Sequence, residues 1–133
     1  MPVTSVSVRN YKSYISFLPA AFVAAGIAIA SLWENPQMPE AVALSDKTWH
    51  LILYAVLGLA LMAALVANRH TRIYHYVLAC VSVTAYGALM EILQRFCTLT
   101  RSGEMADLYA DALGAVIGII IVALWHRLFS TSH

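Results

Sequence analysis

The stretch TWHLILYAVLGLALMAALVAN, residues 48–68, is a run of 21 residues without a formal charge, and it decides the fold class. A helix needs about 20 apolar residues to cross the hydrocarbon core of a bilayer. The apolar residues of this run do not keep to one face, as they would in an amphipathic helix of a soluble protein. The run is therefore predicted to be a transmembrane helix.

Three further runs have the same character. Residues 13–33, 73–90 and 108–125 contain 21, 18 and 18 residues, and Asp111 is the one formal charge among them. The chain of 133 residues is 61% hydrophobic and 11% charged, whereas soluble domains carry about 25% charged residues. These features predict an all-α membrane protein, a four-transmembrane-helix bundle. It forms a single domain over residues 1–133, with spans at about 13–33, 48–68, 73–93 and 108–125.

The basic residues are divided unequally between the two sides of this bundle. Five of the eight lysines and arginines lie before the first span, in the loop 68–72 or in the C-terminal tail: Arg9, Lys12, Arg69, Arg72 and Arg127. The other side holds Lys47, Arg95 and Arg101 with all seven acids. Because an excess of Lys and Arg marks cytoplasmic segments, both termini are predicted to be cytoplasmic. A cleaved signal peptide is the alternative for the first run, although that run is long for one.

Polar side chains gather near the outer ends of three predicted helices. They are Asp46, Lys47, His50 and Tyr54 on the second, Glu91 and Gln94 on the third, and Asp107 and Asp111 on the fourth. Residues three or four apart share a helix face, and these three helix ends lie on the same side. An ionisable group in the apolar core costs about 2.5–3.5 kcal/mol on insertion scales, so Glu91 and Asp111 should face the bundle interior. A polar pocket at the outer face is predicted.

Each of these residues also has a plainer interpretation, and for Glu91 and Asp111 it is a purely structural role. Asp46 and Asp107 could stabilise helix N-termini, and Lys47 could extend to the interface. His50 and Tyr54 could be packed interior residues, and Gln94 could anchor a helix end. Gly87, Gly114 and Gly118 are predicted to serve helix packing, and the GxxxG spacing of the last two could instead support dimerisation.

The chemistry of the pocket follows from its side chains. Lys47, His50 and Arg101 could hold phosphate or carboxylate groups, while Asp46, Glu91 and Asp107 could bind hydroxyls or amines. If the site is catalytic, Glu91 or His50 is the candidate general base. His50 and the acids offer metal donors, but zinc-type spacing is absent, so no metal or cofactor is expected. No basic run with interleaved aromatic residues indicates nucleic-acid binding.

Three blocks of residues carry a resemblance to a known family. They are Ser45-Asp46-Lys47-Thr48-Trp49-His50 with Tyr54, Leu57 and Gly58; Tyr86-Gly87-Ala88-Leu89-Met90-Glu91-Ile92-Leu93-Gln94; and Arg101, Asp107, Asp111, Gly114 and Gly118. In this order they resemble the DKxxH…Y..LG, YG…E..Q and R…D…N..G…G blocks of VanZ-like proteins. The resemblance covers about residues 45–118, and Asp111 stands where the family usually has asparagine.

The resemblance implies a four-helix protein of the bacterial cytoplasmic (inner) membrane. The family is named for a member associated with low-level resistance to teicoplanin, a glycopeptide antibiotic. The resemblance implies no particular reaction, and whether the protein is an enzyme stays open.

Two functions of different classes are compatible with the sequence. In the first, the outer polar site binds or processes an envelope lipid, a lipid-linked precursor or a lipoglycopeptide. In the second, the protein is a non-catalytic accessory or scaffold subunit of a larger membrane complex, with membrane lipids and possible homo-oligomers as partners. A small transporter is a third, weaker alternative. Cys80 and Cys97 are predicted to be free thiols.

Overall fold

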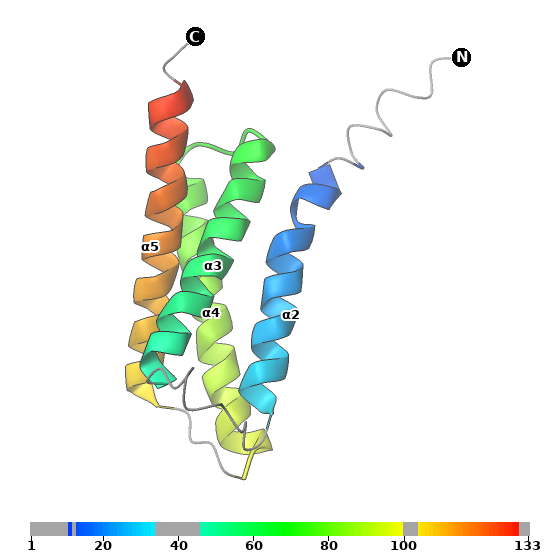
Figure 1. Ribbon diagram of the computed structural model, residues 1–133, viewed down its shortest axis with the longest axis vertical. Helices are drawn as coiled ribbons and strands as arrows, with labels where there is room; N and C mark the ends of the chain where they lie inside the picture. The colour runs from blue at the N-terminus through cyan, green and yellow to red at the C-terminus, as the bar shows by residue number, and fades with distance from the viewer. Residues whose placement is uncertain (1–10, 12, 34–45, 100–103, 131–133) are drawn as a thin grey trace, which may run out of the picture.

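The computed structural model describes residues 11, 13–33, 46–99 and 104–130. In this part of the chain 90% of the residues are helical and no strand is present. The structure describes these helices in chain order: α2 (Leu18–Leu32), α3 (Asp46–Ala67), α4 (Ile73–Cys97) and α5 (Met105–Ser130). They run alternately up and down, so that α3 and α5 begin at the end of the bundle where α2 and α4 finish (Figure 1). The predicted all-α class is therefore confirmed.

Helices α3, α4 and α5 contain 22, 25 and 26 residues, and each is long and apolar enough to cross a membrane. Many of their large apolar side chains are exposed, among them Val81, Ile121 and Leu128. A surface of this kind is suited to lipid as the solvent. Helix α2 is apolar but has only 15 residues, or about 22 Å of helix at 1.5 Å per residue. The helix lengths thus support three of the four predicted crossings.

The limits of α2 follow from Pro19. Proline has no N–H and its ring clashes with the carbonyl four residues earlier, so it is accepted only in the first turn of a helix. The chain accordingly turns at Phe17, and α2 begins at Leu18 with Pro19 as its second residue. The uncharged run 13–33 is for this reason not one continuous helix.

Helices α3 and α5 form the tightest pair of the bundle, and glycines make their close approach possible. A Cβ atom added to Gly58 would lie 2.7 Å from the carbonyl oxygen of Ala115. One added to Gly114 would contact the carbonyl oxygen of Leu51, and one added to Gly118 would contact that of Ala55. The GxxxG face of α5 is therefore occupied inside the bundle, against α3.

The short connection between α3 and α4 is closed by a Schellman motif. The N–H of His70 donates to the carbonyl of Leu65 at 2.8 Å, and that of Arg69 donates to Val66 at 2.9 Å. Arg69 has φ 62°, the left-handed conformation that this motif requires. The side-chain amide of Asn68 donates to the hydroxyl of Ser16 at 2.6 Å. This contact ties the segment before α2 to the same end of the bundle.

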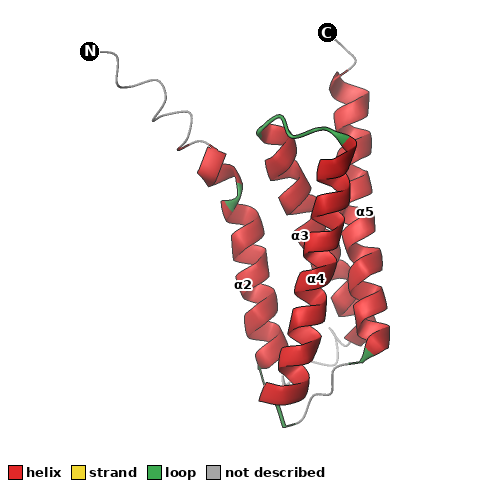
Figure 2. Ribbon diagram, turned by 180° about the vertical axis from the view of Figure 1, so that it is seen from behind, coloured by secondary structure: helices red, strands yellow, loops and turns green. Residues whose placement is uncertain are grey.

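Helix α2 lies on the outside of the bundle beside α3 and α4 (Figures 1 and 2). It buries Ala20, Ile27 and Ser31. The hydroxyl of Tyr86 on α4 donates to the carbonyl of Ala24 at 2.6 Å. Hydrogen bonds from side chains of α4 to backbone carbonyls of α2 hold it in place, because α2 buries few apolar side chains against the bundle.

Candidate functional site

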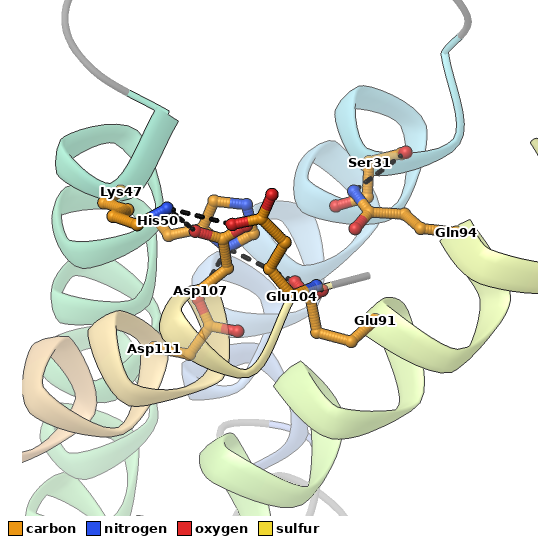
Figure 3. Close-up of polar contacts among 8 residues, drawn as sticks. All are labelled: Ser31, Lys47, His50, Glu91, Gln94, Glu104, Asp107 and Asp111. Carbon is orange, nitrogen blue, oxygen red and sulfur yellow. Dashed lines mark hydrogen bonds and ion pairs between the residues drawn. The ribbon is translucent and has the colours of Figure 1, made fainter. Parts of the chain in front are cut away.

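Three helices bring the polar side chains to one end of the bundle. Helices α3 and α5 begin there and α4 ends there, and α3 and α5 carry their polar residues within the first two turns. Figure 3 shows Lys47 and His50 on α3, Glu91 on α4, and Asp107 and Asp111 on α5 turned toward a common centre. The helix termini supply N–H groups and the side chains supply charge at the same depth.

The innermost contact joins His50 to Asp111. The Nδ1 atom of His50 lies 2.8 Å from Oδ1 of Asp111 and 3.7 Å from Oε1 of Glu91. Asp111 is 0% exposed, and both His50 and Glu91 are buried. A buried carboxylate is tolerated only with hydrogen-bond partners or countercharge. The imidazole of His50 supplies a hydrogen-bond partner, and it supplies a countercharge when it is protonated. We call His50, Glu91 and Asp111 the inner triad.

Gly87 makes room for this triad. A Cβ atom at this position would lie 2.6 Å from Oδ2 of Asp111 and 3.1 Å from Cε1 of Tyr54. A larger residue at this position would force the side chain of Asp111 to shift. Tyr54 is 1% exposed, and its ring is nearly parallel to that of His50, at 3° with a centroid separation of 6.2 Å. The predicted packing role of Gly87 is specifically to admit the side chains of Asp111 and Tyr54.

A second, outer layer of charges covers the triad. The Nζ atom of Lys47 lies 3.2 Å from Oε2 of Glu104 and 3.3 Å from Oδ1 of Asp107. The Lys47 and Glu104 side chains are about half exposed, whereas Asp107 is buried. The backbone N–H of Glu104 donates to Oε2 of Glu91 at 2.8 Å. Glu104 therefore links the outer layer to the triad.

The other residues predicted for the site do not belong to these two layers or are not described. Gln94 is buried and donates to the carbonyl of Ser31 at 3.1 Å, so it joins α4 to α2 and lies apart from the triad (Figure 3). Asp46 is the exposed first residue of α3, and its carboxylate lies within 4.8 Å of donor atoms of His50 and Asp107, at the edge of the site. Arg101 lies outside the described residues.

Glu104 is the contributor that sequence reasoning left out of the site. It precedes α5 and acts partly through its backbone N–H, which no side-chain pattern reveals. Arg95 lies one turn beyond Glu91 on α4, and this i, i+4 spacing groups the two residues in the sequence, although Arg95 was not among the predicted site residues. Glu104 and Arg95 line the same cavity as Glu91.

Two cavities flank the first turns of α5. The first measures about 260 Å³ and lies between α4 and α5; its lining includes Glu91, Arg95, Glu104 and Leu108. The second measures about 320 Å³ and is lined by Lys47, Leu51, Tyr109 and Leu113 between α3 and α5. A larger, apolar cavity of about 580 Å³ lies toward the opposite end, beside Trp125 and Phe129, and contacts none of the charged residues above. Glu91, a member of the triad, borders the first of these cavities.

The triad can exchange protons and bind cations. Imidazole and carboxylate groups in hydrogen-bond contact form a general acid–base pair. Within the described residues, two groups bring donor atoms within 4.8 Å of one another: the triad itself, and Asp46, His50 and Asp107. His50 belongs to both groups. The site thus combines a buried cluster of imidazole and carboxylate groups with the half-exposed ammonium group of Lys47.

A comparison with family models gives one match, to the model described as VanZ/LLP1, over residues 4–126. Comparisons with curated proteins and with solved structures gave no significant match. The matched range includes α2, α3, α4 and most of α5, with every described residue of the site. The resemblance inferred from three sequence blocks is confirmed over nearly the whole chain. The protein is therefore a member of the VanZ/LLP1 family.

Proposed function

We propose that this protein binds the polar headgroup of an envelope lipid or lipid-linked precursor at the outer face of the bacterial inner membrane. The observation that carries the proposal is the position of Glu91. This residue belongs to the buried triad and also lines the cavity between α4 and α5. A headgroup in that cavity would contact the triad through Glu91, while its acyl chains extended along the apolar surface of the bundle.

The charges and sizes of the cavities support this class of ligand. Arg95 lines one cavity and Lys47 the other, so each offers a cation to a phosphate or carboxylate. Ligand pockets for drug-sized molecules measure about 300–1,000 Å³, and the two cavities measure about 260 and 320 Å³. These volumes favour a small phosphate-bearing headgroup over an entire lipoglycopeptide. A contribution to teicoplanin resistance would then act through the envelope lipid.

Processing of the ligand would use the triad as acid and base. His50 contacts Asp111, which holds the imidazole in one orientation, and Glu91 lies between this pair and the cavity. A hydroxyl or amine of the headgroup would lose a proton to the carboxylate of Glu91. Protonated His50 would then stabilise the negative charge that develops on the headgroup oxygen or nitrogen. The roles proposed for Glu91 and His50 as catalytic residues rest on this order of contacts.

Glu91→Gln is expected to reduce lipid copurification at least about tenfold, because a charge-assisted contact contributes about 1.5–3 kcal/mol. The amide oxygen of glutamine can still accept the N–H of Glu104, so the fold should persist. Native mass spectrometry from mild detergent, with lipid identification, measures the result. His75→Gln, at the far end of the same helix, is the control and should retain the lipid. Equal lipid in wild type and Glu91→Gln would remove the proposed role of Glu91.

The proposed topology places both termini in the cytoplasm, with α2 as a fourth crossing and the polar site outside. Cys97 provides a direct test, since it is exposed at the last residue of α4, whereas Cys80 is half-buried in the middle of that helix. A membrane-impermeant maleimide should label Cys97 in intact spheroplasts, and Cys97→Ser should abolish the labelling. Labelling of Cys97 only after the membrane is opened would reverse the topology.

A scaffold role in a membrane complex is the second candidate. The complete burial of Asp111 favours it, because an enclosed ion pair can be a structural network alone. The GxxxG face does not favour it, since Gly114 and Gly118 already contact α3. The same mass spectra separate the two: stoichiometric protein partners or a homo-oligomer without lipid would support the scaffold.

A further inference from the structure

The inner triad has the composition of a metal site. The donor atoms of His50, Glu91 and Asp111 come from three different helices and lie within 4.8 Å of one another. His50 Nδ1 is 2.8 Å from Asp111 Oδ1 and 3.7 Å from Glu91 Oε1. Two ligands that each lie about 2.1 Å from a tetrahedral ion are separated by about 3.4 Å. The distances around His50 lie on either side of this value, so small side-chain rotations suffice.

Unsatisfied oxygen atoms supply an independent observation. Within the described part of the chain, Oδ2 of Asp111, Oε1 of Glu91 and the hydroxyl of Tyr54 are buried without a hydrogen-bond partner. The side chain of Asp111 is 0% exposed and Tyr54 is 1% exposed. Both residues lie against the same glycine, Gly87. Buried polar groups without partners are rare, and binding of an ion is one of their ordinary causes.

Charge and ligand type indicate what the site would take. Two carboxylates and a neutral imidazole carry a charge of −2, which a divalent cation balances. The mixture of one nitrogen and two oxygen ligands suits a transition metal, whereas Mg²⁺ and Ca²⁺ prefer oxygen alone. The alternative group of Asp46, His50 and Asp107 is weaker, because Asp107 is already paired with Lys47 at 3.3 Å.

We propose that His50, Glu91 and Asp111 bind one divalent transition-metal ion of the zinc or manganese class. Tyr54 lies beside the site, next to Asp111. The cavity lined by Glu91, Arg95 and Glu104 leads to the Glu91 side of the ion. The spacing of these residues along the chain shows no metal motif, because each ligand comes from a different helix. The proposal does not depend on the proposed lipid ligand.

Metal binding can be measured directly on the purified protein, without an affinity tag that binds metal. After EDTA treatment, titration with Zn²⁺ and with Mn²⁺ should show binding of one ion per chain by calorimetry and elemental analysis. His50→Gln and Asp111→Asn each remove a ligand or its charge and should weaken the binding at least tenfold. His75→Gln is the matched control, because His75 and His70 have adjacent rings, 4.8 Å apart, and could bind zinc adventitiously.

The possible results separate clearly. Loss of binding in His50→Gln with retention in His75→Gln supports the site. The proposal is overturned if wild type does not bind the metal at about 100 μM, or if His50→Gln binds it equally well. A Kd above that concentration corresponds to a binding free energy of less than about 5.5 kcal/mol in magnitude. Glu91→Gln provides a second variant if His50→Gln does not fold. Lipid copurification is measured on the same samples, so a metal-free protein that retains its lipid would refute the metal site alone.

Discussion

Gly118→Leu is expected to destabilise the packing of α5 against α3 more than any other single substitution in the apolar core of the bundle. A Cβ atom at Gly118 would contact the carbonyl oxygen of Ala55 and would lie 2.7 Å from the backbone nitrogen of Leu59. These are backbone atoms of α3, which cannot rotate away as a side chain can. The two helices would have to separate, and the contacts at Gly58 and Gly114 would separate with them.

The expected loss is at least about 3 kcal/mol in the free energy of unfolding, the upper end of the range for overpacked cores. Unfolding in mixed micelles with increasing SDS measures it. Gly26→Leu is the matched control, because a Cβ atom at Gly26 meets nothing within 4 Å. Glycine in a helix is less favourable than other residues by up to about 1 kcal/mol, so Gly26→Leu should be neutral or stabilising. Equal unfolding curves for the two variants would show that the α3–α5 contact is not as close as described.

The sequence predicted the helices well where hydrophobicity alone decides them. The uncharged runs located α3, α4 and α5, although α4 continues to Cys97 and α5 begins at Met105, beyond the runs. Absence of charge marks the apolar part of a helix, whereas a helix ends only where its backbone hydrogen bonds end. Pro19, which was not used in the prediction of the first span, accounts for the late start of α2.

The convergence of His50, Glu91 and Asp111 was predictable because topology places three helix ends together. The direction of Gln94 was not. Three residues turn a helix by about 300°, so Gln94 points about 60° away from Glu91. Whether Gln94 also faces His50 and Asp111 depends on the rotation of α4 about its axis. The contact of Gln94 with Ser31 of α2 shows that it faces α2. Glu104 was missed for a different reason, since its link to Glu91 is made by a backbone N–H.

The second large effect is expected from His50→Leu. This change leaves Asp111, 0% exposed, and Glu91 in a buried site without the imidazole between them. Removal of one partner from a buried ion pair typically costs about 3–5 kcal/mol, because the other charge stays buried and uncompensated. Asp111→Asn should cost less, because asparagine has nearly the same shape and its carbonyl can still accept from His50. The VanZ-like pattern, which usually has asparagine here, is consistent with a neutral residue at this position.

The double variant His50→Leu/Asp111→Asn tests whether the pair is coupled. With a neutral side chain at position 111, the loss of the imidazole leaves only Glu91 without a countercharge. The double variant should therefore be more stable than the sum of the single changes predicts, by about 1–3 kcal/mol. The same unfolding assay measures the coupling, with EDTA present so that bound metal does not contribute. Additivity within about 0.5 kcal/mol would show that His50 and Asp111 do not interact.

The same double variant also separates stability from function. If only structure requires the polar pair, a double variant that still folds should retain its cellular role. If the triad binds a ligand, the folded double variant should still lack bound lipid, because His50 and the charge of Asp111 are gone from the site beside Glu91. A folded double variant that retains the wild-type lipid would show that His50 and Asp111 serve the fold alone. Loss of lipid from a folded double variant would show that they serve ligand binding.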